Sequence, residues 1–284
     1  MKLSALSSIP LSIAVCAAFL FGGCSDGAPA LAERKLVAEG WIDSGGYPVV
    51  LLTLSAVPQE EAVSVAGNIV RWGVVSLSDG ERTIVLTGGP SDDYFPPFRY
   101  YSYEMAGVPG RTYTLTAEYE GRRITSSVTM PEPTPILSAE RTAVEAADTL
   151  SHIELRFRAP EDLPACYHVS YMIQGVDRRF LPSMLGALEV REAGAEVRVP
   201  VYRSRSSFSL EKFQPEMPAD RAVTVKLERV APEVFRFWRA FDDATLTEGS
   251  AFVSGPGSLP SNIIGGLGVF SAAGTSTVTV PPLR

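Results

Sequence analysis

The chain has 284 residues and a formal net charge of −7, so its surface is acidic. An acidic surface argues against nucleic acid as a partner. The three cysteines are too few for a disulfide framework, so an apolar core has to hold the body together. A chain of this length suits two domains or one large β domain.

Residues 1–23 have the pattern of a secretory signal peptide. Lys2 supplies a short positive region, and a nearly continuous apolar run follows over residues 11–21. This run is shorter than the roughly 20 residues that a membrane-spanning helix needs. The small residues Gly22 and Gly23 come next, as expected before a cleavage point. We therefore expect the signal peptide to be removed.

The segment Phe21-Gly22-Gly23-Cys24 resembles the bacterial lipobox. In that motif the cysteine thiol receives a diacylglycerol, the preceding peptide is removed, and the new amine is usually acylated. The resemblance implies lipidation of Cys24, a tether over residues 24–33 and membrane anchorage without a spanning helix. The alternative is an ordinary secretory signal that happens to precede a cysteine. No Asp directly follows Cys24, so the inner-membrane retention signal is absent and the outer membrane is expected, with its face left open.

Alternation of apolar and polar residues dominates the rest of the chain and predicts an all-β fold. The clearest strand covers residues 112–119, with Tyr113 and Leu115 on one face and threonines on the other. Glu120-Gly121 then turns the chain into a partner strand. In the first half, strands are expected near residues 35–42, 47–55, 69–77, 82–87, 99–106, 111–119 and 122–130.

Short strands at this spacing suggest a two-sheet sandwich over residues 34–131. Residues 108–113 are similar to the turn and tyrosine before a late strand of immunoglobulin-like and fibronectin type III domains. This similarity implies a fold and no function. Pro131, Pro133 and Pro135 then end the last strand and predict a stiff, extended linker at a domain boundary.

Residues 132–284 are expected to form a second, antiparallel β-rich domain with one helix. Pro232 and Glu233 suit the first turn of this helix, which is predicted near residues 232–242. Its apolar residues fall at helical spacing and are expected to seal a sheet: Val234, Phe237, Trp238 and Phe241. The strands of this half are expected near residues 152–158, 167–174, 195–201, 222–230 and 271–281.

The most site-like stretch begins as a loop at Asp92 and places aromatic residues beside carboxylates. Exposed aromatic rings can stack on a sugar, a haem-like ring or a partner protein. Contact with a ligand or partner is therefore assigned to Asp92, Asp93, Phe95 and Phe98. Two adjacent carboxylates alone make a poor calcium cage, so no metal site is predicted.

A structural interpretation of the same stretch follows from strand alternation. It predicts that Tyr101 and Tyr103 face the core while Tyr100 and Ser102 face solvent. Phe95 and Phe98 would then close the end of the sandwich. This interpretation is favoured for the strand half of the stretch.

Two other motifs favour structural roles over chemistry. Residues 265–268 (Gly-Gly-Leu-Gly) lack the lysine and the following helix of a phosphate loop, so they predict a tight turn or a close backbone approach. Cys166 and His168 share one face of a strand and suggest a nucleophile–base pair or half a metal site. The chain has only one other histidine, His152, and no clear third ligand, so buried structural roles are favoured.

Several segments in order resemble a family of Gram-negative outer-membrane lipoproteins, the domain of unknown function 4249. The similar segments are residues 36–43 (LVAEGWID), 47–55 (YPVVLLTLS), 110–115 (GRTYTL), the Pro131 region, 233–241 and 261–270 (SNIIGGLGVF). Members of this family often occur beside TonB-dependent outer-membrane transporters. The resemblance implies an accessory role in uptake and supplies no catalytic residues.

Together these features predict a non-catalytic accessory or binding lipoprotein of a TonB-dependent uptake system, with no cofactor and an unidentified ligand. The alternative is a fimbrial or adhesin-type structural surface lipoprotein, because such proteins also combine lipoboxes with paired β-sandwiches. An enzyme such as a surface hydrolase is a third hypothesis, and no constellation of residues in the sequence supports it.

Overall fold

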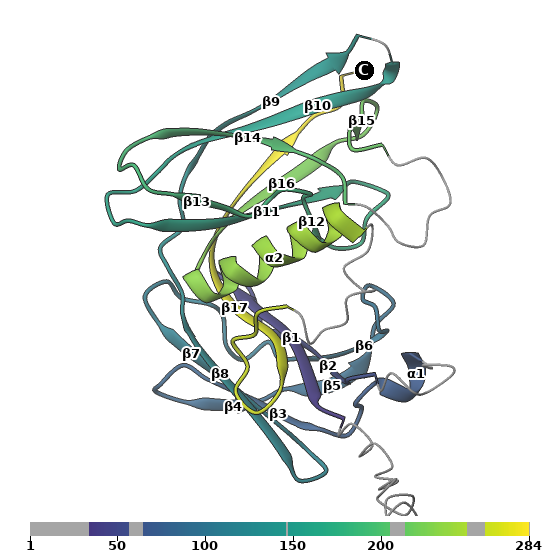
Figure 1. Ribbon diagram of the computed structural model, residues 1–284, viewed down its shortest axis with the longest axis vertical. Coiled ribbons are helices and arrows are strands. Elements are labelled where there is room, and N and C mark those ends of the chain that lie inside the picture. The colour runs from purple at the N-terminus through teal and green to yellow at the C-terminus, as the bar shows by residue number, and fades with distance from the viewer. Residues whose placement is uncertain (1–33, 57–64, 146, 205–213, 249–258, 284) are drawn as a thin grey trace, which may run out of the picture. The chain divides into compact units, whose positions relative to one another are not determined.

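The alternating segments form strands in a computed structural model, which describes residues 34–56, 65–145, 147–204, 214–248 and 259–283. The predicted signal peptide, the tether and Cys24 lie outside these residues. The all-β fold class is confirmed, since strands dominate the described residues (Figure 1). The helices there are the four-residue α1 (Val65–Asn68) and the longer α2 (Pro232–Glu248).

Most strands of the first half follow the predicted ranges closely. In β1 the buried residues alternate with more exposed ones, because one face packs on a core. The strands of this half are β1 (Leu36–Asp43), β2 (Val49–Leu54), β3 (Val74–Ser78), β4 (Thr83–Val85), β5 (Thr87–Pro90), β6 (Phe98–Tyr101), β7 (Thr112–Tyr119) and β8 (Arg122–Thr129).

The second half contains the predicted strands and several that the alternation did not predict, including β9 directly after the proline run. Its long strands are β9 (Ile136–Val144), β10 (Ala147–Arg158), β11 (Ala165–Ile173), β14 (Glu196–Val201), β16 (Val223–Val230) and β17 (Leu267–Val280). The short ones are β12 (Leu181–Pro182), β13 (Leu188–Val190) and β15 (Met217–Pro218).

The largest sheet contains strands from both halves, in the order β12-β11-β16-β17-β1-β2-β6-β5, with β13 paired to β11. At its centre β17 runs parallel to β1, which sets Gly40 opposite Phe270 and Trp41 opposite Ser271. β16 lies antiparallel on the other side of β17. Figure 1 shows β17 passing from one group of strands to the other, so the last strand joins the two halves.

Two smaller sheets enclose two hydrophobic cores against this large sheet. The sheet β4-β3-β7-β8 shares the first core with β1 and β2, around Leu115 and Phe270. The sheet β14-β10-β15, with β9 paired to β10, shares the second core with β11 and β16, around Phe157 and Tyr167. β17 contributes to both, because Phe270 lies in the first core and Val280 in the second.

The predicted boundary near Pro131 falls between the strands that surround the first core and most of those that surround the second. The exception is β17, which belongs to residues 132–284 yet pairs with β1. Ile263, from the segment before β17, also packs in the first core. Separate domains over residues 34–131 and 132–284 imply independent folding, and that division stays a prediction.

Close packing of β17 on β1 requires glycine at the start of β17. Gly268 has a φ of +111°, a conformation that residues with a Cβ rarely adopt. A Cβ at this position would also collide with the carbonyl oxygen of Ala38. The glycines of residues 265–268 therefore provide the close backbone approach that the sequence predicted.

The tyrosine corner suggested by residues 108–113 is present. The Tyr113 hydroxyl accepts a hydrogen bond from the Val108 N–H at 2.7 Å and lies 3.4 Å from the Ala106 carbonyl oxygen, to which it donates. Its side chain is fully buried in the first core. The ring therefore ties the turn before β7 to the sandwich, as in the domains that the sequence resembles.

The predicted orientation of β6 is wrong. Tyr100 and Ser102 are buried, whereas Tyr101 is half-buried and the Tyr103 side chain is 67% exposed. The Tyr100 hydroxyl donates to the Val70 carbonyl oxygen at 2.9 Å, which secures the ring in the core. Alternation defines two faces of a strand but leaves open which one meets the core, and a shift of one residue exchanges them.

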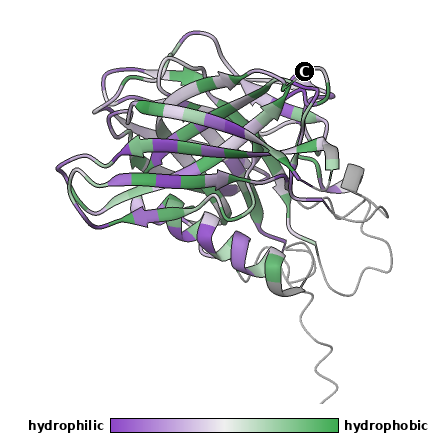
Figure 2. Ribbon diagram, turned by 90° about the horizontal axis from the view of Figure 1, so that it is seen from above, coloured by the Kyte–Doolittle hydropathy of each residue, from purple (hydrophilic) through white to green (hydrophobic). Residues whose placement is uncertain are grey.

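The helix α2 begins at Pro232 as predicted and continues beyond residue 242 to Glu248. Its buried Val234 packs with Cys166 and Val269, so the helix seals one face of the large sheet. Figure 2 shows α2 along one side of the strands, with hydrophilic and hydrophobic residues alternating along it. No helix in the described part of the chain is long and apolar enough to cross a bilayer.

Candidate functional site

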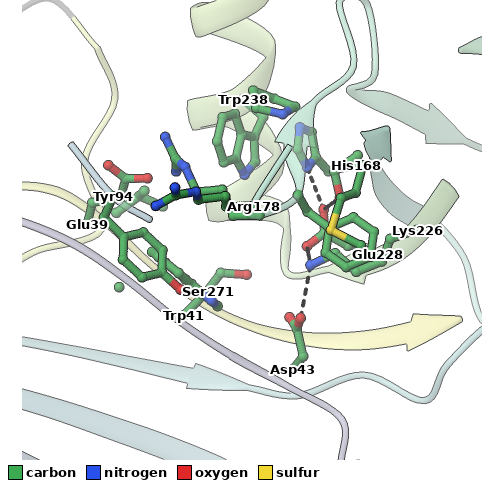
Figure 3. A pocket seen from close by; sticks show the side chains of 17 residues that line it. Glu39, Trp41, Asp43, Tyr94, His168, Arg178, Lys226, Glu228, Trp238 and Ser271 are labelled. Carbon is green, nitrogen blue, oxygen red and sulfur yellow. Dashed lines mark hydrogen bonds and ion pairs between the residues drawn. The ribbon is translucent and has the colours of Figure 1, made fainter. Parts of the chain in front are cut away.

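A pocket of about 310 Å³ lies beside α2, on the face of the large sheet where β1, β17, β16 and β11 are neighbours. The loop before β6 and the loop between β11 and β12 complete its wall (Figure 3). The lining residues are Glu39, Gly40, Trp41, Asp43, Tyr94, His168, Ser170, Met172, Arg178, Arg179, Phe180, Pro182, Lys226, Glu228, Trp238, Val269 and Ser271.

Strand periodicity gathers the polar residues of this pocket. Alternate residues of a strand share a face, so Glu39, Trp41 and Asp43 of β1 all line the pocket. On the neighbouring strands the antiparallel register places His168 of β11 opposite Glu228 of β16. The pocket floor is therefore a patch of sheet surface that α2 leaves uncovered.

A buried network of charged side chains forms one end of the pocket. Lys226 Nζ donates to Asp43 Oδ2 at 2.9 Å and to Glu228 Oε1 at 2.7 Å. Glu228 Oε2 accepts a hydrogen bond from Ser170 Oγ at 3.1 Å and lies 2.7 Å from His168 Nδ1. Asp43 Oδ1, in contrast, is buried and has no hydrogen-bond partner among the described residues. This oxygen is shielded from the pocket, although the Asp43 side chain as a whole is 23% exposed and lines it.

The network fixes the charges of its members. Burial alone raises the pKa of Glu228, but Lys226 and His168 outweigh burial and hold this pKa at about 2. Burial lowers the pKa of Lys226, and the two carboxylates outweigh it and raise the pKa above its ordinary value. For Asp43 burial dominates, and its pKa is raised despite the nearby ammonium group. Lys226 is therefore protonated and Glu228 ionised at neutral pH.

Aromatic rings form the side walls of the pocket. The rings of Trp41 and Tyr94 have centroids 5.6 Å apart and are tilted by 49°. Trp238, from α2, stacks on His168 with centroids 4.2 Å apart and an angle of 11°. In Figure 3 the Trp41–Tyr94 pair and Trp238 lie on either side of Arg178. The walls therefore offer flat apolar surfaces on either side of the Arg178 side chain.

Two adjacent arginines lie at the mouth of the pocket. The Arg178 side chain is 69% exposed, and its Nη1 atom lies 4.0 Å from Asp93 Oδ1. The guanidinium of Arg179 lies 5.6 Å from the Tyr94 ring centroid. Opposite charge comes from Glu39 of β1, an exposed residue that lines the pocket. The mouth therefore combines two cations with an exposed carboxyl group.

The loop singled out from the sequence borders this pocket. Tyr94 lines it, and Asp93 pairs with Arg178 across its rim. Asp92 is exposed, and Phe95 is 54% exposed. Phe98 instead stacks edge-on against Tyr100 with centroids 5.6 Å apart and packs on the first core. Contact of Asp92, Asp93, Phe95 and Phe98 with a ligand or partner stays a prediction.

Cys166 and His168 do not form a common site, because Cys166 lies in a core and His168 lines the pocket. Cys166 is buried in the small cluster beneath α2, and burial raises the pKa of its thiol. His168 lines the pocket and bonds with Glu228. His152 is exposed on β10 and does not line the pocket. In the described part of the chain no group of three or more His, Cys, Asp and Glu side chains has the arrangement of a metal site.

Sequence reasoning missed the charged floor of the pocket. Lys226 and Glu228 alternate with apolar residues of β16, a pattern that indicates an ordinary solvated strand face. One signal was available, because Glu39 and Asp43 form the same pattern on β1. Only the pairing of β17 with both strands shows that these faces meet.

This arrangement is suited to holding a ligand. Lys226 is a poor nucleophile because it is held as an ammonium ion by two carboxylates. Glu228 is a weak base because its charge is stabilised by Lys226 and His168. The floor thus provides fixed charges and preformed hydrogen-bonding groups on a rigid sheet.

Replacing Lys226 by methionine tests the balance of this network. The Lys226→Met substitution leaves Asp43 and Glu228 buried without their cation, so the free energy of unfolding at pH 7 should fall by about 3–5 kcal/mol. Without Lys226 the folded-state pKa of Glu228 rises above its unfolded value. The penalty is therefore full above this raised pKa and shrinks as the pH falls from there toward the unfolded value. Urea denaturation at neutral and acidic pH measures both effects.

The matched control is Lys35→Met, which removes an exposed lysine at the start of β1. This variant should unfold at nearly the same urea concentration as the original protein at both pH values. A Lys226→Met protein as stable as the control at neutral pH would show that the buried carboxylates do not depend on the ammonium group.

Comparison with known proteins gives one finding about the whole chain. The family model described as "Domain of unknown function (DUF4249)" matches residues 28–279. No curated protein matches the chain. The matched range includes β1, all of β17 except Val280, and every residue that lines the pocket. The chain therefore belongs to the DUF4249 family.

Proposed function

We propose that this chain is a lipid-anchored binding component of an outer-membrane uptake system, held by a lipidated Cys24 and serving a TonB-dependent transporter. The pocket beside α2 carries the proposal, because it gives the body a place to hold a small molecule. The apolar run, the small residues and the cysteine in that order support the anchor. The resemblance to lipoproteins encoded beside such transporters supports the partner.

The size of the pocket suits a compact ligand. Its volume of about 310 Å³ is at the lower end of the range of small-molecule sites, roughly 300–1,000 Å³. The floor comes from four paired strands, so the site is preformed and little conformational entropy is lost on binding.

The chemistry of the lining suits a flat ligand with an acidic group. The Trp41–Tyr94 pair offers an aromatic surface for stacking. Arg178 at the mouth offers an exposed guanidinium, a group that pairs with carboxylates in two-point contacts. Asp43 lines the pocket with a side chain that is 23% exposed, so its carboxylate can accept a hydrogen bond from a ligand hydroxyl. An aromatic acid with hydroxyl groups satisfies all three demands.

Titration with 2,3-dihydroxybenzoate tests this site. Binding should change the tryptophan fluorescence, because Trp41 and Trp238 line the pocket. The Trp41→Ala and Arg178→Gln substitutions should each weaken binding by about tenfold, which corresponds to about 1.4 kcal/mol per lost stacking or charge-assisted contact. Isothermal titration calorimetry supplies the dissociation constants.

Two controls make this test specific. Trp72→Ala changes an exposed tryptophan that does not line the pocket and should leave the affinity unchanged. Catechol, which lacks the carboxylate, should bind more weakly than 2,3-dihydroxybenzoate. Equal affinity of the Trp41→Ala variant and the original protein would contradict binding in this pocket.

The lipid anchor is tested in cells by metabolic labelling with a clickable palmitate analogue. The protein should become labelled and stay with the membrane fraction, because two or more acyl chains anchor a protein stably. A Cys24→Ser variant should lose both the label and the membrane association. An unlabelled product that buffer alone extracts would overturn the anchor while leaving the pocket untouched.

The transporter partner is tested by photocrosslinking from the rim of the pocket. A photoreactive residue in place of Phe95, on the loop that borders the pocket, should capture an outer-membrane transporter identified by mass spectrometry. The same residue in place of Leu137, an exposed position on β9, serves as the control. Recovery of no transporter above this control would count against the partnership.

A further inference from the structure

A second surface, away from the pocket, exposes large apolar residues beside arginines. We call it the hairpin-end surface and define it by Arg71, Trp72, Val74, Arg122 and Arg123. Trp72 is 89% exposed and Val74 is 57% exposed. With the turn that joins β7 to β8, Trp72, Val74 and both hairpin arginines line one shallow hollow of about 490 Å³. Fully exposed tryptophan is unusual on a soluble surface and marks a contact site.

The described body begins at this same surface. The Arg122 Nε atom donates to the Arg34 carbonyl oxygen at 3.1 Å, and Arg34 Nη1 donates to Asn68 Oδ1 at 3.2 Å. Figure 1 shows the start of β1 and the hairpin of β7 and β8 at the same end of the strands. The ten residues from Cys24 to Glu33 span at most about 35 Å. An anchor at Cys24 therefore keeps this end of the body close to the membrane.

The charge of this surface contrasts with that of the whole chain. Arg122 and Arg123 line the hollow together with Glu118 and Glu120, and the exposed Arg71 precedes Trp72 in the chain. Arg123 pairs with Glu118 at 2.6 Å, and Arg122 lies 3.4 Å from Glu120. The cations outnumber the acids, although the protein carries −7 overall.

We propose that the hairpin-end surface rests on the membrane that holds the anchor, with Trp72 in the headgroup layer and the arginines on lipid phosphates. The proposal relies on the lipid anchor of the proposed function. Tryptophan favours the interface between water and lipid, because its ring is apolar and its N–H is polar. Basic residues beside an anchor strengthen the attachment to an anionic surface. Docking would fix the orientation of the pocket relative to the bilayer.

Quenching by brominated lipids tests this docking with an anchor attached chemically. Residues 24–284 are coupled through Cys24 to a maleimide lipid in vesicles of phosphatidylethanolamine and phosphatidylglycerol that contain brominated acyl chains. Cys166 is buried and should not react. Tryptophan fluorescence should be quenched in the original protein, and the quenching should be lost in Trp72→Phe. The loss assigns the quenched fluorescence to Trp72.

Two further variants separate the apolar and the ionic contributions. Arg71→Gln combined with Arg123→Gln should reduce quenching on anionic vesicles, and phosphatidylcholine vesicles should reduce it in the original protein. Leu137→Ser, which changes an exposed apolar residue on β9, should leave quenching unchanged. Circular dichroism verifies that each variant is folded.

Two results would overturn the docking. The first is a failure of the quenching experiment. Either Trp72→Phe is quenched as strongly as the original protein, or the original protein is not quenched on anionic vesicles. The second is a photoreactive residue at position 72 that captures a protein and no lipid in cells, which would make this surface a protein interface. The maleimide lipid replaces the natural anchor, so the first result does not depend on lipidation in cells, and neither result depends on ligand binding in the pocket.

Discussion

The parallel pairing of β1 with β17 is the constraint on which the rest of the structure depends. It joins the first strand of the described body to the last, and β17 carries residues of both hydrophobic cores. It also brings the β1 face with Glu39 and Asp43 next to the β16 face with Lys226. The pairing relies on Gly268, where a side chain would collide with the β1 backbone. The pocket and both hydrophobic cores therefore depend on this one strand pairing.

Local patterns in the sequence predicted most strands because buried and more exposed residues alternate along strands such as β1, β7 and β8. They also predicted α2, and its buried Val234 confirms the sealing role. They failed at β6, where Tyr100 rather than Tyr101 faces the core. This strand has four residues between loops, so its orientation is set by pairing with β2 and β5 rather than by its own alternation. Longer strands such as β7 leave no such ambiguity.

The pocket was beyond sequence reasoning because its parts are distant in the chain. Asp43 and Lys226 are separated by 183 positions yet form a hydrogen bond of 2.9 Å. On its own, each of the two resembles a solvated residue on a strand. The loop with Tyr94 was noticed because aromatic and acidic residues are dense there, and it does border the pocket. A dense local composition can thus identify residues at the rim of the pocket. The floor is formed by paired strands, so its residues can be identified only once the sheet topology is known.

The charged floor is not explained by stability alone. Moving Lys226, Asp43 and Glu228 out of water is costly, and apolar side chains of similar volume would often be as stable or more so. Their hydrogen bonds instead hold each atom in a defined place, and one carboxylate oxygen of Asp43 is left without a partner among the described residues. A network that only filled space would have no reason to line an open hollow. Its position beside the aromatic walls makes recognition of a small polar molecule the simplest physical account of these charges.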